Sequence, residues 1–146
     1  MSLPTKGYEP EEIWAPIISV FIANTILYFV AQCLKDNSIV DITWGFMHVI
    51  PNAVVWIINK NTTDSSIACN VLLLVWAVRM AAYNISRHTH EDWRYQNMRA
   101  DFSKNGQTAY YIIAYFGIYF VQSIFQLIIN GPALFLSIWS TNGMTP

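Results

Sequence analysis

The sequence predicts an all-α, polytopic membrane protein with four transmembrane helices and both termini on the same side. The 146 residues are 54% hydrophobic and only 12% charged, and no charged side chain follows Lys104. Four apolar runs occupy residues 13–34, 39–59, 66–86 and 109–130. At a rise of about 1.5 Å per residue, each run is long enough to cross a hydrocarbon layer of about 30 Å.

Short polar turns separate the first three predicted helices. Asp36, Asn37 and Ser38 follow the first run, and residues 61–65 follow the second. Both segments consist of residue types that cap helices and form turns. Such short connections predict three antiparallel neighbours. Pro51 lies in the middle of the second run and predicts a bend there.

The fourth helix is predicted to end or kink at Gly131 and Pro132. A helix that continued to Trp139 would be much longer than the hydrocarbon layer is thick. Residues 131–146 are therefore expected to lie along the membrane interface or against a partner, and residues 87–108 to form a polar, solvated loop. All 146 residues belong to a single membrane domain, because too few lie outside the membrane to build a soluble core.

The distribution of cations predicts the orientation. The side that holds the termini carries Lys6 and Lys60. The opposite side carries five cations: Lys35, Arg87, Arg94, Arg99 and Lys104. The positive-inside rule therefore places the termini outside, which is the intermembrane space if the membrane is the mitochondrial inner membrane. The net charge of −1 gives no cationic surface for nucleic acid, so that class of partner is excluded.

Asp41 and Arg79 are charged residues inside the apolar runs. If the second and third helices pair about their turn, residues whose numbers add up to about 125 lie side by side. Asp41 then lies level with Asn84, and Arg79 lies about five residues deeper. We expect a structural ion pair between Asp41 and Arg79. The alternatives are a proton or ligand path and an arginine that extends to the interface.

The second predicted helix has a polar face. Asp41, Gly45, His48 and Asn52 are spaced by four, three and four residues, so they share one side and should point into the bundle. His48 is the residue on this face most suited to catalysis or to binding a metal or haem. However, no other histidine lies within a run, and a haem or metal ion needs more than one ligand. We expect a packing histidine.

The fourth predicted helix carries a second polar stripe. Its members recur at helical spacing: Tyr111, Tyr115, Tyr119, Gln122, Gln126 and Asn130. Polar side chains commonly join helices in lipid, so this stripe predicts a hydrogen-bonded seam with neighbouring helices or with another subunit. A small-molecule cavity is the alternative. In either case the stripe should avoid lipid.

The predicted polar loop contains several potential metal donors. They are His88, His90, Glu91 and Asp92. A metal site would require a further, well-spaced ligand elsewhere, and the sequence offers none. No metal is predicted.

Two segments carry a family resemblance. Asp41, Trp44 and Gly45 match a D-x-x-W-G entry to a helix, and residues 91–99 match an E-D-x-R-Y-x-x-M-R loop. The matching loop positions are Glu91, Asp92, Arg94, Tyr95, Met98 and Arg99. In this order the segments resemble polytopic proteins of unknown function grouped with the steroid 5-alpha-reductase C-terminal domain. Arg79 resembles the arginine of that family's next helix, and the likeness extends over most of residues 35–139.

The resemblance implies a membrane reductase that uses NADPH. In that family the nucleotide contacts lie largely in a later half, which ends with an arginine-histidine-proline-asparagine-tyrosine signature. This sequence contains neither that signature nor a glycine-rich phosphate turn. No catalytic, cofactor-binding or metal residue is therefore carried over. NADPH is expected only if another polypeptide supplies the missing half, and a bound phospholipid is compatible with the cationic loop.

Three hypotheses follow. The first is a non-catalytic accessory subunit of a larger membrane complex, with a respiratory-chain complex of the mitochondrial inner membrane favoured and the endoplasmic reticulum as the alternative. Its physical basis is the expectation that four helices are too few to bury two polar stripes, so other subunits should cover them. The second is half of a split NADPH-dependent reductase acting on a lipid or sterol. The third is a small transporter that uses Asp41, Arg79 and His48.

Overall fold

The computed structural model describes residues 10–59 and 63–139, and this part of the chain is helical throughout apart from short connections. Its long helices are α1 (Pro10–Leu34), α2 (Ile39–Asn59) and α3 (Asp64–Arg87), followed by a continuous fourth helix. Four helices are long and apolar enough to cross a membrane. The prediction of an all-α protein with four spans is confirmed, and the chain is an integral membrane protein.

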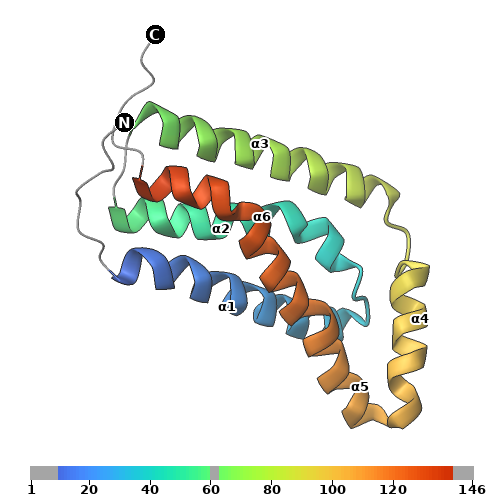
Figure 1. Ribbon diagram of the computed structural model, residues 1–146. Helices are drawn as coiled ribbons and strands as arrows, with labels where there is room; N and C mark the ends of the chain where they lie inside the picture. The colour runs from blue at the N-terminus through green and yellow to red at the C-terminus, as the bar shows by residue number, and fades with distance from the viewer. Residues whose placement is uncertain (1–9, 60–62, 140–146) are drawn as a thin grey trace.

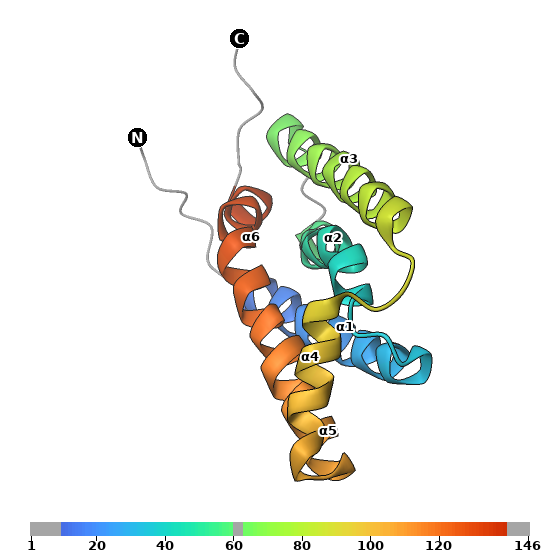
Figure 2. The same ribbon diagram turned by 90° about the vertical axis from the view of Figure 1, so that its right-hand side faces the viewer.

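Three helices lie side by side and a fourth crosses them. α1, α2 and α3 run in alternating directions, whereas the fourth helix crosses α1 and α2 obliquely (Figures 1 and 2). α4 (Trp93–Phe102) lies across one end of the bundle and is joined to the fourth helix by the short 3₁₀ turn η1 (Ser103–Asn105). Pro10 and Trp139 both lie at the opposite end, in agreement with the predicted topology.

The fourth helix is longer than the sequence predicted. It consists of α5 (Gln107–Ala114), the π-helix η2 (Tyr115–Phe120) and α6 (Val121–Trp139). The prediction that the chain leaves the helix at Gly131 is wrong, because α6 continues through Pro132. Its oblique path explains how the added length fits, since a tilted helix spends more residues in crossing a layer of fixed thickness (Figure 1). Residues 140–146 of the predicted tail lie outside the described residues.

The segment 87–108 is not an irregular loop. α4 occupies its centre and is N-capped by Asp92, whose side chain accepts a hydrogen bond from the backbone N–H of Arg94. The predicted solvated loop is wrong here. Its charged composition does not distinguish a loop from a short polar helix. α4 is held by contacts with residues far away in the sequence, which are described below.

The turn between α1 and α2 forms a C-cap for α1. Lys35 adopts a left-handed conformation with φ of 57°, and the N–H of Asp36 bonds to the carbonyl of Ala31. This pattern satisfies carbonyl groups at the end of a helix. The carboxylate of Asp36 then accepts a hydrogen bond from the backbone N–H of Ser38, next to the start of α2. The predicted turn is confirmed here, while residues 60–62 of the second turn lie outside the described residues.

α2 and α3 approach closely through small residues. A Cβ atom added to Gly45 would lie 2.6 Å from the Cα atom of Ala77, so only glycine fits at this position. At the end of the pair, the Asn84 side chain donates a hydrogen bond of 2.6 Å to the carbonyl of Asp41. The register predicted from the turn, with Asp41 level with Asn84, is confirmed.

The π-helix η2 changes which residues of the fourth helix face the bundle. A π turn holds an extra residue, so it shifts the helical face by one position. Tyr110, rather than Tyr111, is buried on the N-terminal side of η2, and Tyr111 is 43% exposed. The predicted stripe is therefore wrong at Tyr111, whereas Tyr119, Gln126 and Asn130 are buried as expected. Tyr115 and Gln122 are partly buried.

Candidate functional site

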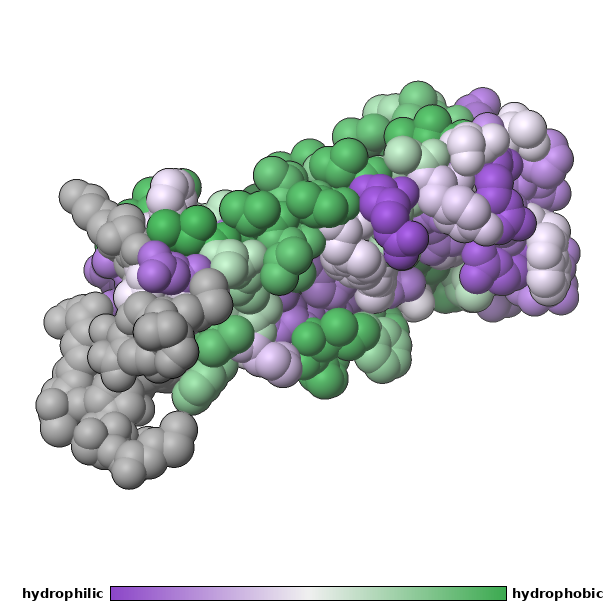
Figure 3. Space-filling model, turned by 90° about the horizontal axis from the view of Figure 1, so that it is seen from above, coloured by the Kyte–Doolittle hydropathy of each residue, from purple (hydrophilic) through white to green (hydrophobic). Residues whose placement is uncertain are grey.

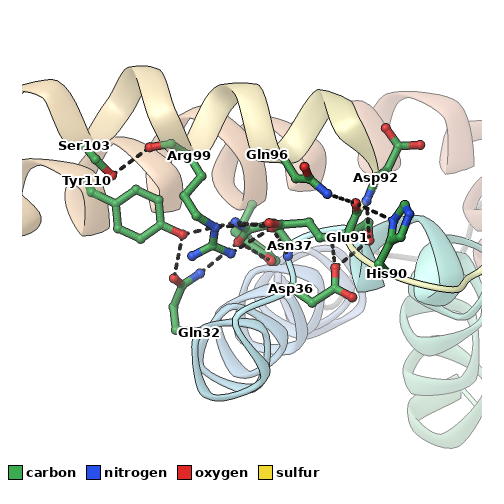
Figure 4. A network of polar contacts seen from close by, with 12 residues as sticks. Gln32, Asp36, Asn37, His90, Glu91, Asp92, Gln96, Arg99, Ser103 and Tyr110 are labelled. Atoms are coloured by element: carbon green, nitrogen blue, oxygen red, sulfur yellow. Dashed lines mark hydrogen bonds and ion pairs between the residues drawn. The ribbon is translucent and has the colours of Figure 1, made fainter.

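The polar end of the bundle is organised around the carboxylate of Glu91. This carboxylate accepts hydrogen bonds from the backbone N–H of Asn37 at 2.8 Å and from the Asn37 side chain at 3.2 Å. Arg99 of α4 donates two more, at 2.8 and 3.1 Å. The Glu91 side chain is 10% exposed. One carboxylate thus joins the turn before α2 to α4 (Figure 4).

Asn37 extends this network into the bundle. Its side-chain amide donates to the Tyr110 hydroxyl, and its side-chain oxygen accepts from Gln32 and Tyr119. Tyr110 in turn donates to Gln32, and Arg99 lies over the Tyr110 ring (Figure 4). The sequence marked Asn37 only as a turn residue. Its burial, at 1% exposed, was not predictable because the partners come from helices distant in the chain.

Asp41 has partners other than the predicted one. Its carboxylate accepts a hydrogen bond of 3.0 Å from Arg94 and another of 3.0 Å from the Tyr95 hydroxyl. Arg79 is exposed and forms no hydrogen bond or ion pair with any described residue. The predicted ion pair between Asp41 and Arg79 is therefore wrong. α4, whose existence the sequence did not indicate, brings two better placed donors.

Most of the motif residues thus meet at one place. Asp41 from α2 contacts Arg94 and Tyr95 from α4, and Gly45 permits the approach of α3. One motif position of this segment takes no part: Met98 is 41% exposed. Trp44 lies beside His48 instead, with ring centroids 5.4 Å apart.

The pKa values of the groups around α4 reflect these contacts. Burial, together with the neighbouring Asp41, raises the pKa of Tyr95 above its usual range. The hydrogen bond from Arg99 to Glu91 raises the pKa of Arg99. The hydrogen bonds from Arg94 lower the pKa of Asp92. Arg94, Arg99 and Asp92 are therefore charged at neutral pH, and the Tyr95 hydroxyl is a stable donor to Asp41.

Two cavities border this cluster. The outer cavity, of about 340 Å³, lies between the ends of α2 and α3 and the start of α4. The inner cavity, of about 310 Å³, is lined by α2, α3, α4 and α6. Three residues line both: Asp41, Asn84 and Arg94. Arg87, His88, His90 and Trp93 belong to the outer cavity only, and Trp44, Met80 and Gln122 to the inner one.

A second polar layer lies deeper in the bundle. The Asn52 side chain donates to the His48 carbonyl and to Asn130, while Asn130 donates to the same carbonyl. Ser137 donates to Asn52, and Asn24 of α1 donates to Gln126 at 2.7 Å. The predicted hydrogen-bonded seam of the fourth helix is therefore formed with α1 and α2 of the same chain.

His48 is buried between two tryptophans. Its Nδ1 atom bonds to the Trp44 carbonyl at 3.0 Å, and its ring meets the edge of Trp76. Its Nε2 atom has no hydrogen-bond partner among the described residues. Within residues 10–59 and 63–139, no group of three or more histidine, cysteine, aspartate or glutamate side chains is placed to hold a metal ion.

Comparison with known proteins places these features in a family. Residues 27–144 match the family model described as a protein of unknown function, DUF1295. The chain belongs to the DUF1295 family. The match includes both motif segments, the turn with Asn37 and all of α4. No curated protein and no solved structure matches the chain, so DUF1295 membership supplies a relationship but no activity.

Acid is expected to loosen α4 through Asp92. The folded pKa of Asp92 lies below its ordinary value of 3.8, so its stabilising contribution is complete above that value and is lost as the pH falls through the folded pKa. We expect the protection of α4 amides, measured as hydrogen exchange relative to the intrinsic rate at each pH, to fall more in the wild type than in Asp92→Asn when the pH is lowered from about 5 to about 3, since asparagine still caps the helix but does not titrate. An equal fall in protection in both proteins would contradict this role.

Proposed function

We propose that this chain is a non-catalytic membrane subunit that neighbouring subunits hold through the outer face of α3. The observation that carries the proposal is Arg79. It is exposed, it is the only charged residue of α3 between Asp64 and Arg87, and it has no partner among the described residues. A charged side chain inside a span costs about 3 kcal/mol on insertion scales and usually faces protein or water.

The position of Arg79 favours a protein partner over escape to the interface. It lies eight residues before Arg87, which corresponds to about 12 Å along the helix. An arginine side chain covers only about half of that distance. Around it, α3 exposes Leu72, Val75 and Val78, and hydrophilic surface interrupts the apolar band seen from this side (Figure 3). A neighbouring helix with a carboxylate at this depth would neutralise the charge.

The physical reason for partners differs from the one that the sequence indicated. Polar stripes were expected to need other subunits, but His48, Asn52, Gln126 and Asn130 are buried and largely matched within the bundle. α3, in contrast, packs almost solely on α2 and exposes most of its length. The need for a neighbour is therefore localised to α3.

The proposed setting is a respiratory-chain complex of the mitochondrial inner membrane. Small subunits that are nearly all membrane helix suit such assemblies, and five cations lie at the end of the bundle formed by α4. Under the positive-inside rule this end faces the matrix and the termini face the intermembrane space. The same rule would place the α4 end in the cytosol if the membrane were the endoplasmic reticulum.

The subunit proposal predicts a charge-specific assembly defect. Arg79→Leu should fold, since a leucine suits lipid, but it should reduce incorporation into the large complex at least about fivefold because the partner's carboxylate loses its counter-charge. Arg79→Lys is the matched control and should retain most incorporation. The measurement is a native gel of membranes solubilised in mild detergent. Equal incorporation of both variants, or migration of the wild type as a free 16.7 kDa chain, would contradict the proposal.

A second candidate, half of a split membrane reductase, is favoured by the two cavities beside Arg94. The resemblance of the motif segments to the steroid 5-alpha-reductase C-terminal domain supports it, and an NADPH-binding half would come from another polypeptide. This candidate requires a co-purifying protein with the arginine-histidine-proline-asparagine-tyrosine signature and NADPH-dependent reduction of a lipid or sterol. Absence of either from the purified assembly would eliminate it.

A further inference from the structure

The outer and inner cavities at the α4 end form two chambers with a shared wall. Asp41, Asn84 and Arg94 line both. The outer chamber opens beside Trp93, which is 68% exposed at the end of the spans, and the inner chamber has Trp44 and Met80 in its wall. Exposed tryptophan is typical of the headgroup layer of a membrane. The pair of chambers thus extends from the level of lipid headgroups to side chains within the spans of α2 and α3.

In the outer chamber the carboxylate oxygens already accept hydrogen bonds, whereas several arginine N–H groups have no acceptor among the described residues. Both oxygens of Asp41 accept from α4, one from Tyr95 and one from Arg94. Both oxygens of Asp92 accept from Arg94. The two carboxylates are therefore satisfied.

The arginines of the outer chamber are only partly used. Among the described residues, Arg94 bonds through its backbone N–H, Nε and Nη2, and Arg87 bonds through Nη1 to Tyr83. The Nη1 group of Arg94 and the Nε and Nη2 groups of Arg87 have no partner there. A phosphate group, which accepts several hydrogen bonds and prefers guanidinium donors, complements this set.

We propose that these chambers bind one phospholipid, with its phosphate at Arg87 and Arg94 and an acyl chain beside Trp44 and Met80. A nucleotide phosphate shares the headgroup chemistry. Trp44 and Met80 favour the lipid, because both lie within membrane spans, where an acyl chain is the usual neighbour and a water-soluble ligand is not. This site does not depend on the chain being a subunit.

Native mass spectrometry of the full-length protein tests the site. Detergent-purified protein is titrated with phosphatidylglycerol, with diacylglycerol of the same acyl chains, and with NADPH or inorganic phosphate as competitors. The test variant is Arg87→Gln, which removes one charge from the outer chamber. The matched control is Lys104→Gln, which removes one charge from an exposed pair with Asp101 outside both chambers.

We expect retention of phosphatidylglycerol but not of diacylglycerol, and an affinity about tenfold lower in Arg87→Gln than in Lys104→Gln. Equal retention of diacylglycerol, or equal effects of the two substitutions, would overturn the phosphate site. Displacement of phosphatidylglycerol by NADPH or by inorganic phosphate at similar concentration would overturn the lipid assignment. The last result is also distinguishable from failure of the subunit proposal, which the native gel measures.

Discussion

Replacing Gly45 by alanine is expected to destabilise the bundle by about 2 kcal/mol, although the change adds only one methyl group. The new Cβ atom would lie 2.6 Å from Cα and 2.9 Å from Cβ of Ala77. Neither atom belongs to a flexible side-chain end, so α2 and α3 must move apart. Separation would also weaken the hydrogen bond between Asn84 and Asp41 at the end of the same pair. Unfolding of the purified protein in mixed detergent micelles measures the effect.

Gly117→Ala is the matched control for this prediction. It adds the same methyl group to the fourth span, where the nearest atom outside the helix is Phe102 Cζ at 3.8 Å, an ordinary contact. We expect its free energy of unfolding to stay within about 1 kcal/mol of wild type. If Gly45→Ala were no more destabilising than Gly117→Ala, the close approach of α2 and α3 would be refuted.

Glu91→Gln is expected to cost about 2 to 3 kcal/mol and to release α4 from the bundle, because the isosteric amide loses the charge that Arg99 and Asn37 share. The side chains of Glu91 and Arg99 are 10% and 29% exposed, so water cannot fully replace the lost contacts. The amide also presents N–H groups towards the Arg99 donors. Limited proteolysis and hydrogen exchange of α4 should report this loosening together with the global loss of stability.

Asp101→Asn provides the comparison for Glu91. It removes a carboxylate from α4 itself, but its pair with Lys104 has side chains that are 65% and 72% exposed. Exposed pairs of this kind contribute less than about 1 kcal/mol. Similar protection of α4 in both variants would show that the Glu91 network does not hold this helix.

Much of the membrane architecture was predictable because it depends on local sequence. The spans follow from apolar length, and the pairing of Asp41 with Asn84 follows from the short turn between α2 and α3. The inward face with His48 and Asn52 follows from regular helical spacing. In each case the distances involved lie within one helix or across one turn.

The candidate site was less predictable because it depends on contacts between distant segments. Asp41 pairs with Arg94, 53 residues later, since α4 folds back over the end of α2. Nothing in the local sequence showed that Asp41 would pair with Arg94 rather than with Arg79. The π-helix η2 likewise moved Tyr110 into the core in place of Tyr111, and a π turn has no clear pattern of residue types. The sequence identified the motif residues, but it did not predict which residues they contact.

The most direct test of the subunit proposal is site-specific photo-crosslinking from the outer face of α3 in native membranes. Val75 lies one helical turn before Arg79 and is 60% exposed, so a photoreactive residue at this position reports what covers Arg79. The proposal predicts one protein adduct of defined mass, formed within the large complex and lost when Arg79→Leu is added. Adducts to lipid alone, or an adduct unchanged by Arg79→Leu, would contradict it.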